Sequence, residues 1–121
     1  MNDRAQELRD RTKAFALRVI KVCRSLPRSL DGQVMGKQLL RCGTSVAANY
    51  RAACRARSRP EFLAKLGIVL EEADEAVLWM ELLVESGTVK KEKLALLLNE
   101  ARQLTAIFTA ATATIRRTRN L

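Results

Sequence analysis

Apolar residues recur at every third or fourth position along most of the chain, the spacing that places them on one face of an α-helix. The clearest stripe lies near the end of the chain and continues without a break over about six helical turns. Its members are Leu94, Leu97, Leu98, Ala101, Leu104, Phe108, Ala111 and Ile115. Because the periodicity is helical rather than strand-like in every such segment, we predict an all-α fold.

Proline and glycine residues separate four helical segments. The predicted helices cover residues 2–25, 33–56, 59–85 and 89–117. Ser58 is expected to cap the third helix, with Pro60 in its first turn, whereas Gly87 should end that helix and Thr88 should cap the fourth. Long helices joined by short loops pack as antiparallel neighbours. We therefore predict an antiparallel up-down-up-down four-helix bundle that forms a single domain over residues 1–121.

The third segment has apolar residues on more than one side of the helix. Such a helix needs either a thicker core within its own subunit or the surface of another subunit. We favour self-association, because a chain of 121 residues has little interior to spare. Leu78, Trp79 and Leu82 are the residues expected at the oligomer interface.

Composition excludes several classes of function. The chain has no histidine, which removes the commonest general base and rules out a Ser-His or Cys-His nucleophile. Cys23, Cys42 and Cys54 lack a metal-binding or disulfide spacing and are expected to be reduced, partly buried thiols. The start of the chain is too polar for a signal peptide, and no apolar run is long enough to span a membrane. We expect a cytoplasmic, non-enzymatic protein without catalytic residues or a cofactor, and with no membrane partner.

Glu71, Glu72, Asp74 and Glu75 are the candidates for a metal site, because helical spacing places pairs of their carboxylates on one face. Di-iron sites in helix bundles combine glutamate with a Glu-x-x-His motif, however, and this chain has no histidine. We therefore expect no metal site. The alternative is that these carboxylates form ion pairs with the basic residues of the second helix.

Positive charge is concentrated in the first and last parts of the chain. Residues 1–28 carry eight basic and three acidic groups, and residues 88–121 carry seven and two. Residues 29–87 carry seven basic and eight acidic groups, so they are close to neutral. The formal net charge of +9 therefore comes from the first and fourth helices.

An up-down-up-down arrangement brings the start of the first and third helices and the end of the second and fourth helices to one pole of the bundle. Nine arginines are expected there: Arg4, Arg9, Arg11, Arg55, Arg57, Arg59, Arg116, Arg117 and Arg119. The acids expected at the same pole are Asp3, Glu7, Asp10 and Glu61. Arginine makes bidentate contacts with phosphate, so this pole is a candidate surface for RNA or DNA. The alternatives are that it aids solubility or contacts an acidic surface of another subunit.

Part of the chain resembles a known family. Residues 36–51 are similar to the G-x-Q-L-x-R-x-x-x-S-[IV]-x-x-N pattern of the bacterial four-helix-bundle proteins encoded in intervening sequences of 23S ribosomal RNA genes, often labelled S23 ribosomal proteins. Residues 62–66, 71–75 and 79–81 also resemble the third helix of that family. The likeness covers residues from about 14 to 86. Many members have an acid-Gly pair where this chain has Ala52-Ala53, so any role of that pair is not carried over.

This resemblance has implications for assembly and partners. Relatives with this fold assemble as pentameric rings or barrels, which implies a homopentamer here. A more distant relative, the accessory variability protein of diversity-generating retroelements, binds nucleic acid and a reverse transcriptase. The matching residues Ser45 and Asn49 are expected to have a structural role, with hydrogen bonds across the bundle or between subunits.

Two hypotheses for function follow. The first is a homo-oligomer, expected to be a pentamer, that binds RNA or DNA without strong sequence preference through its arginine-rich pole. The chain has no signature of a helix-turn-helix, zinc finger or RNA-recognition module, so backbone contacts should dominate binding. The alternative is a protein scaffold or an accessory subunit of a nucleic-acid-processing enzyme such as a reverse transcriptase.

Overall fold

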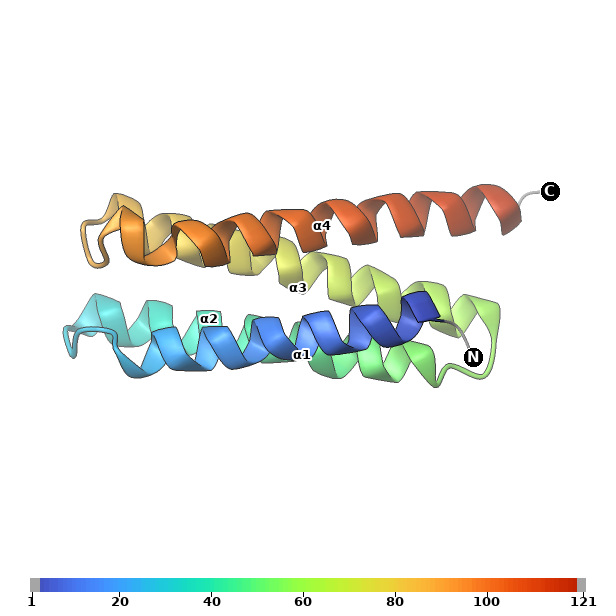
Figure 1. The fold of residues 1–121 in the computed structure, drawn as a ribbon, viewed down its shortest axis with the longest axis horizontal. Helices are drawn as coiled ribbons and strands as arrows, with labels where there is room; N and C mark the ends of the chain where they lie inside the picture. Colours follow the sequence, from blue (N-terminus) through green and yellow to red (C-terminus); the bar gives the residue numbers. More distant parts are fainter. Residues whose placement is uncertain (1–2, 120–121) are drawn as a thin grey trace.

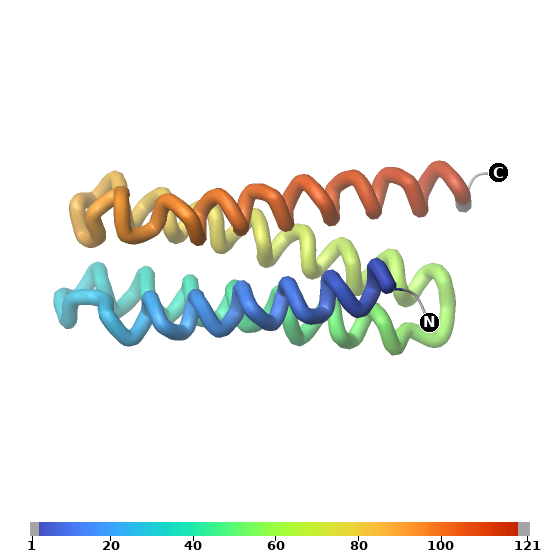
Figure 2. Tube along the Cα trace, in the orientation of Figure 1, coloured from blue at the N-terminus to red at the C-terminus, as the bar shows by residue number. Residues whose placement is uncertain are grey.

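The computed structural model describes residues 3–119 and consists of four helices with no strand among those residues. The helices are α1 (Asp3–Arg24), α2 (Leu30–Cys54), α3 (Arg59–Glu85) and α4 (Lys91–Arg119). They run alternately up and down as an elongated bundle, with both chain termini at one end (Figure 1 and Figure 2). The prediction of an all-α, antiparallel four-helix bundle is thus confirmed.

The start of α2 differs from the prediction. The helix begins at Leu30 rather than Gln33, because Ser29 acts as the N-cap and its Oγ accepts a hydrogen bond from the backbone N–H of Gly32 at 3.3 Å. Ser58 caps α3 in the same way, as predicted, by accepting from the N–H of Glu61 at 3.2 Å.

The connection between α3 and α4 also corrects the prediction. Gly87 has a left-handed backbone with φ of +77°, a conformation that glycine adopts without strain and that ends α3. Thr88 does not cap α4, because the helix begins only at Lys91. The Thr88 hydroxyl instead lies 2.7 Å from that of Ser86, within the loop.

One continuous hydrophobic core runs along the bundle. It includes the fully buried side chains of Phe15, Val19, Leu39, Val46, Val69, Met80, Leu104 and Phe108. Helices adjacent in sequence pack closely along their length, whereas α1 and α4 share a narrower contact. Gly43 allows α1 to approach α2, since a Cβ atom at this position would lie 2.7 Å from a methyl carbon of Val19. None of the helices within residues 3–119 has the length and apolar character needed to cross a bilayer.

Candidate nucleic-acid interface

The end of the bundle that holds both termini is the pole at which the arginines were predicted (Figure 1). Arg57 lies in the loop between α2 and α3, Arg59 is the first residue of α3, and Arg116 and Arg117 lie in the last turns of α4. All four side chains are exposed. The side chain of Arg119 lies outside the described residues. Topology therefore brings arginines from different helices to one end, as expected.

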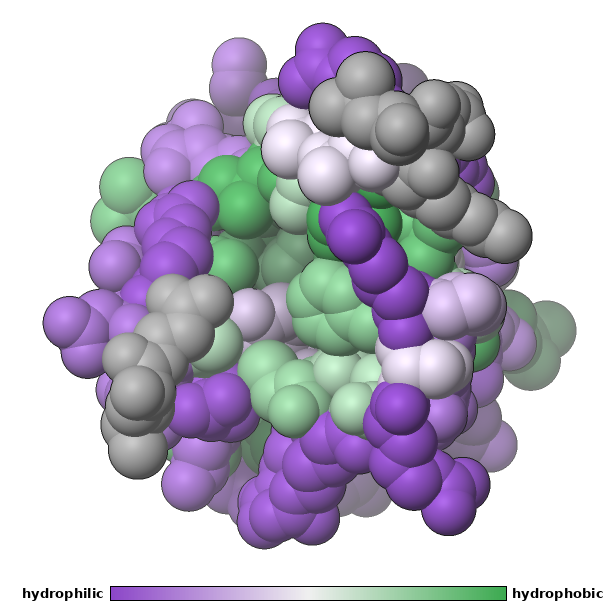
Figure 3. Space-filling view, turned by 90° about the vertical axis from the view of Figure 1, so that its right-hand side faces the viewer, coloured by the Kyte–Doolittle hydropathy of each residue, from purple (hydrophilic) through white to green (hydrophobic). Residues whose placement is uncertain are grey.

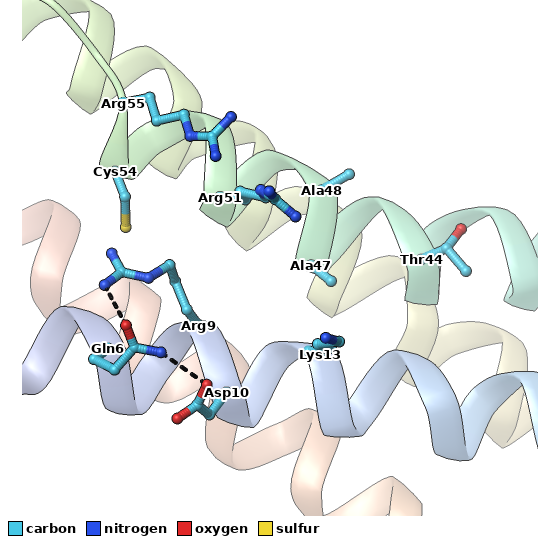
Figure 4. Close-up of a pocket in the computed structure, with 10 residues that line it drawn as sticks. All are labelled: Gln6, Arg9, Asp10, Lys13, Thr44, Ala47, Ala48, Arg51, Cys54 and Arg55. Atoms are coloured by element: carbon cyan, nitrogen blue, oxygen red, sulfur yellow. Dashed lines mark hydrogen bonds between the residues drawn. The ribbon is translucent and has the colours of Figure 1, made fainter.

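A groove between α1 and α2 collects further basic side chains near this pole. It has a volume of about 660 Å³ and is lined by Arg9 and Lys13 from α1, by Arg51 from α2 and by Arg55, the C-cap of α2 (Figure 4). Arg9 and Lys13 are four residues apart and so lie one turn apart on the same face of α1. Arg55 follows Arg51 by four residues, directly after the last residue of α2. The structure thus adds two basic residues, Lys13 and Arg51, to two of the predicted arginines. We call this site the α1–α2 groove.

The remaining lining of the α1–α2 groove leaves room for a ligand. Ala47 and Ala48 contribute only methyl groups from α2, and Ala47 lies on the side of α2 that faces Lys13 of α1 (Figure 4). Asp10 supplies the one carboxylate among the described residues that line the groove, and it accepts a hydrogen bond from Gln6 Nε2 at 2.9 Å. The Gln6 amide oxygen in turn accepts from Arg9 Nη2 at 2.7 Å and holds this guanidinium beside the groove.

The centre of the pole is apolar. Viewed onto this end, hydrophobic side chains lie in the middle and hydrophilic side chains surround them (Figure 3). A hollow of about 410 Å³ is lined there by residues that include Tyr50, Ala53 and Phe62, and it shares Arg9 and Cys54 with the α1–α2 groove. Burial raises the pKa of Tyr50, as does a hydrogen bond with Cys54. Its ring packs in the core rather than offering a face on which a base could stack.

Arg11 has a different role from the one predicted for it. Its Nε and Nη2 atoms donate to the two carboxylate oxygens of Glu100 on α4, each at 2.8 Å, and Nη2 also donates to Gln103. The hydrogen bond with Glu100 raises the pKa of the Arg11 guanidinium, which therefore remains charged. Arg11 joins α1 to α4, so we leave it out of the proposed binding surface.

Two other predicted arginines make exposed ion pairs near the pole. Arg4 Nη1 lies 3.1 Å from Glu7 Oε1, and Arg57 Nε lies 4.0 Å from Glu61 Oε2. Exposed pairs of this kind contribute little to stability. A phosphate group could therefore replace either carboxylate at small cost to the fold.

Two of the acidic residues of α3, Glu72 and Glu75, form ion pairs with Arg41 of α2, which confirms the expected ion pairing. Arg41 Nη1 lies 2.9 Å from Glu72 Oε2, and Arg41 Nη2 donates to Glu75. The Cys42 Sγ atom and these two carboxylates lie within 4.8 Å of one another, the spacing of a metal site. Arg41 already neutralises both carboxylates, and burial raises the pKa of the Cys42 thiol to about 12. This donor set fits an ion-pair network better than a metal centre.

Ser45 and Asn49 hydrogen-bond to each other within α2, so the bonds expected across the bundle are not formed, and the alternative of bonds between subunits stays a prediction. Asn49 Nδ2 donates to Ser45 Oγ at 2.7 Å and to the Ser45 carbonyl oxygen at 3.0 Å. Residues four apart are neighbours on one helix face, which makes the local partner the nearest one.

The predicted interface residues on α3 divide into two groups. Leu78 and Leu82 are 47% and 39% exposed, a large fraction for leucine side chains within a helix. Trp79, in contrast, packs against the protein's own core and donates its indole N–H to Glu75 Oε2 at 3.0 Å. Leu78 and Leu82 remain candidates for an interface, and Trp79 has a partner within the subunit.

Comparison with known proteins identifies a solved structure with the same fold and a family to which the sequence matches. A crystal structure of a protein of unknown function from the S23 ribosomal protein family of Bacteroides thetaiotaomicron superposes with a TM-score of 0.81 at 33% sequence identity, covering 87% of this chain and 97% of that one. None of the curated proteins compared matches the chain. The model of the family described as 23S rRNA-intervening sequence protein matches residues 4–110. The chain therefore belongs to the family of 23S rRNA-intervening sequence proteins.

Proposed function

We propose that this protein is a non-enzymatic homo-oligomer that binds RNA or DNA through the α1–α2 groove and the adjoining arginine-rich pole, without strong sequence preference. The observation that carries the proposal is the convergence of Arg9, Lys13, Arg51 and Arg55 on one groove that holds a single carboxylate among its described lining residues. Lysine and arginine are fully charged at neutral pH, so the groove concentrates positive charge where a phosphate backbone would lie.

The chemistry of the groove supports backbone contacts over base recognition. Guanidinium groups bind phosphate oxygens in a bidentate manner, and Ala47 and Ala48 provide space without hydrogen-bonding groups that would read base edges. The exposed arginines at the pole would extend the contact beyond the groove. Binding of this type depends on the number of phosphates contacted and weakens as salt concentration rises.

The family name associates these proteins with 23S rRNA, which makes a ribosomal RNA fragment a suitable first probe. Oligomer formation is supported by the exposed Leu78 and Leu82 on α3. We expect a pentamer, which mass measurement in solution will test.

Fluorescence anisotropy with a labelled single-stranded RNA and a DNA duplex tests the binding proposal. A variant with Arg9, Lys13, Arg51 and Arg55 changed to Ala should lose at least tenfold in affinity for both. A control variant changes the exposed Arg24, Arg28, Lys37 and Lys91 to Ala. Each variant lowers the formal net charge from +9 to +5, so only the location of the charge differs. Equal losses in the two variants would show that the groove has no special role.

A second candidate function is a scaffold or accessory subunit of a nucleic-acid-processing enzyme such as a reverse transcriptase. The apolar hollow of about 410 Å³ beside Arg9 favours it, because a phosphate backbone would leave an apolar surface unfilled. An acidic protein surface with an apolar side chain at its centre would contact both parts of the pole. Failure to bind either nucleic acid at low salt would favour this function over the first.

A further inference from the structure

The outer face of α3 carries unpaired acids together with exposed leucines. We call Glu71, Asp74, Leu78, Leu82 and Glu85 the acidic stripe. These residues follow one another at intervals of three or four, so they form one line on the exposed side of the helix. None of the three carboxylates has an ion-pair partner in the part of the chain that the structure describes. The stripe extends over about 21 Å of helix.

A second groove has the opposite charge. It lies between the end of α1 and the start of α4, has a volume of about 730 Å³, and is lined by Arg18, Lys21, Lys90 and Lys93. No acidic residue of the described chain lines it. Its remaining walls are mostly apolar, and the side chain of Leu96 at its edge is 79% exposed. We call this site the α1–α4 groove; it shares no lining residue with the α1–α2 groove.

The two surfaces are complementary but cannot meet within one molecule. The acidic stripe lies on the side of α3 that faces away from the buried residues Ala73 and Ala76, whereas the groove lies between the other helices, α1 and α4. Both surfaces are near the end of the bundle where α1 and α3 finish and α4 begins (Figure 1). A second copy placed beside the first would therefore bring its acidic stripe to the level of this groove.

We propose that the acidic stripe of α3 docks into the α1–α4 groove of the next copy, in a head-to-tail contact. This inference rests on the homo-oligomer of the proposed function and specifies its subunit interface. A symmetric α3–α3 contact would place the acids Glu71, Asp74 and Glu85 of one copy close to the same set of acids of the other copy. Like charges in an interface are unfavourable. Because the two surfaces lie at the same level of the bundle, repetition of the contact favours a closed ring over a helical filament.

Two variants, each with one damaged surface, test the contact by sedimentation velocity over a range of concentrations. The stripe variant carries Leu78→Gln and Leu82→Gln, which remove the apolar contact without adding negative charge, and the groove variant carries Lys21→Glu and Lys93→Glu. Each should sediment as a monomer of about 13.6 kDa. An equimolar mixture should form a one-to-one dimer, since the intact groove of the first variant still fits the intact stripe of the second.

Matched controls are Leu30→Gln, at another exposed leucine, and Lys37→Glu, at an exposed lysine of α2; both should assemble like the unmodified protein. Full assembly of the groove variant by itself would overturn the head-to-tail contact and leave the oligomer of the proposed function intact. A mixture that stays monomeric would also overturn it, in favour of a contact between identical surfaces or with a different partner. If the unmodified protein were a monomer throughout, the proposed oligomer would fail as well.

Discussion

The ion pair between Arg11 and Glu100 should be a main source of stability for the contact between α1 and α4. Their side chains are only 27% and 17% exposed, and two parallel hydrogen bonds of 2.8 Å join them. Hydrogen bonds between charged groups contribute about 1.5 to 3 kcal/mol when shielded from water, whereas exposed ion pairs contribute about 1 kcal/mol or less. We expect Arg11→Ala to lower the free energy of unfolding by about 2 kcal/mol.

The pair between Arg102 and Glu81 is the matched control. These side chains are 55% and 37% exposed and form one contact of 3.0 Å, so Arg102→Ala should cost less than about 1 kcal/mol. For each pair, urea unfolding of the arginine-to-alanine variant, the glutamate-to-alanine variant and the double variant gives the coupling free energy between the two side chains. The coupling should be about 1 to 2 kcal/mol for Arg11 with Glu100 and below about 0.5 kcal/mol for the control.

Thermal unfolding gives a second readout. For a domain of this size, a loss of 2 kcal/mol corresponds to a decrease in Tm of about 8 °C. The decrease for Arg11→Ala should persist at high salt, because burial limits screening of the pair. Equal coupling energies for the two pairs would refute the link between burial of the ion pair and its contribution to stability.

Two further predictions concern packing and pH. Gly43→Ala should lower the free energy of unfolding by about 1 to 3 kcal/mol, since the new Cβ would lie 2.7 Å from a Val19 methyl carbon. Gly67→Ala should instead stabilise the helix by up to about 1 kcal/mol, because beyond the adjacent backbone of α3 the new Cβ would have no described neighbour within 4 Å; urea unfolding distinguishes the two variants. Burial raises the pKa of the Cys42 thiol from 9.0 to about 12. The contribution of the protonated, buried thiol to the free energy of unfolding is therefore complete below pH 9 and is lost as pH rises toward 12. Urea unfolding against pH should therefore show a smaller decrease over this range for Cys42→Ala; equal decreases would contradict the assignment.

The sequence predicted the architecture well because the helices depend on local signals. Apolar spacing located all four helices, and Ser58 and Gly87 located the ends of α3 through their capping chemistry. Short connections then determined the antiparallel order. Errors arose where two local signals competed. Thr88 was predicted to cap α4, but the turn at Gly87 leaves Thr88 inside the loop.

The candidate binding site was less predictable, because it depends on which side chains meet across helices. Arg11 has its partner Glu100 at a distance of 89 positions in the sequence, so its involvement in an ion pair was not visible from local pattern. Lys13 and Arg51 were missed since only residues near helix ends were assigned to the pole. Four-residue spacing, from Arg9 to Lys13 and from Arg51 to Arg55, was the signal that would have identified both.

The central claim is that the α1–α2 groove binds a phosphate backbone, and the salt dependence of RNA affinity tests it most directly. The logarithm of the binding constant should fall linearly with the logarithm of salt concentration, with a slope of about −0.7 for each phosphate contacted on a single strand. Replacing Arg9, Lys13, Arg51 and Arg55 with Ala should reduce the magnitude of that slope by roughly 2 to 3. A slope that equals that of the unmodified protein would contradict the claim, because phosphate contacts would then lie elsewhere.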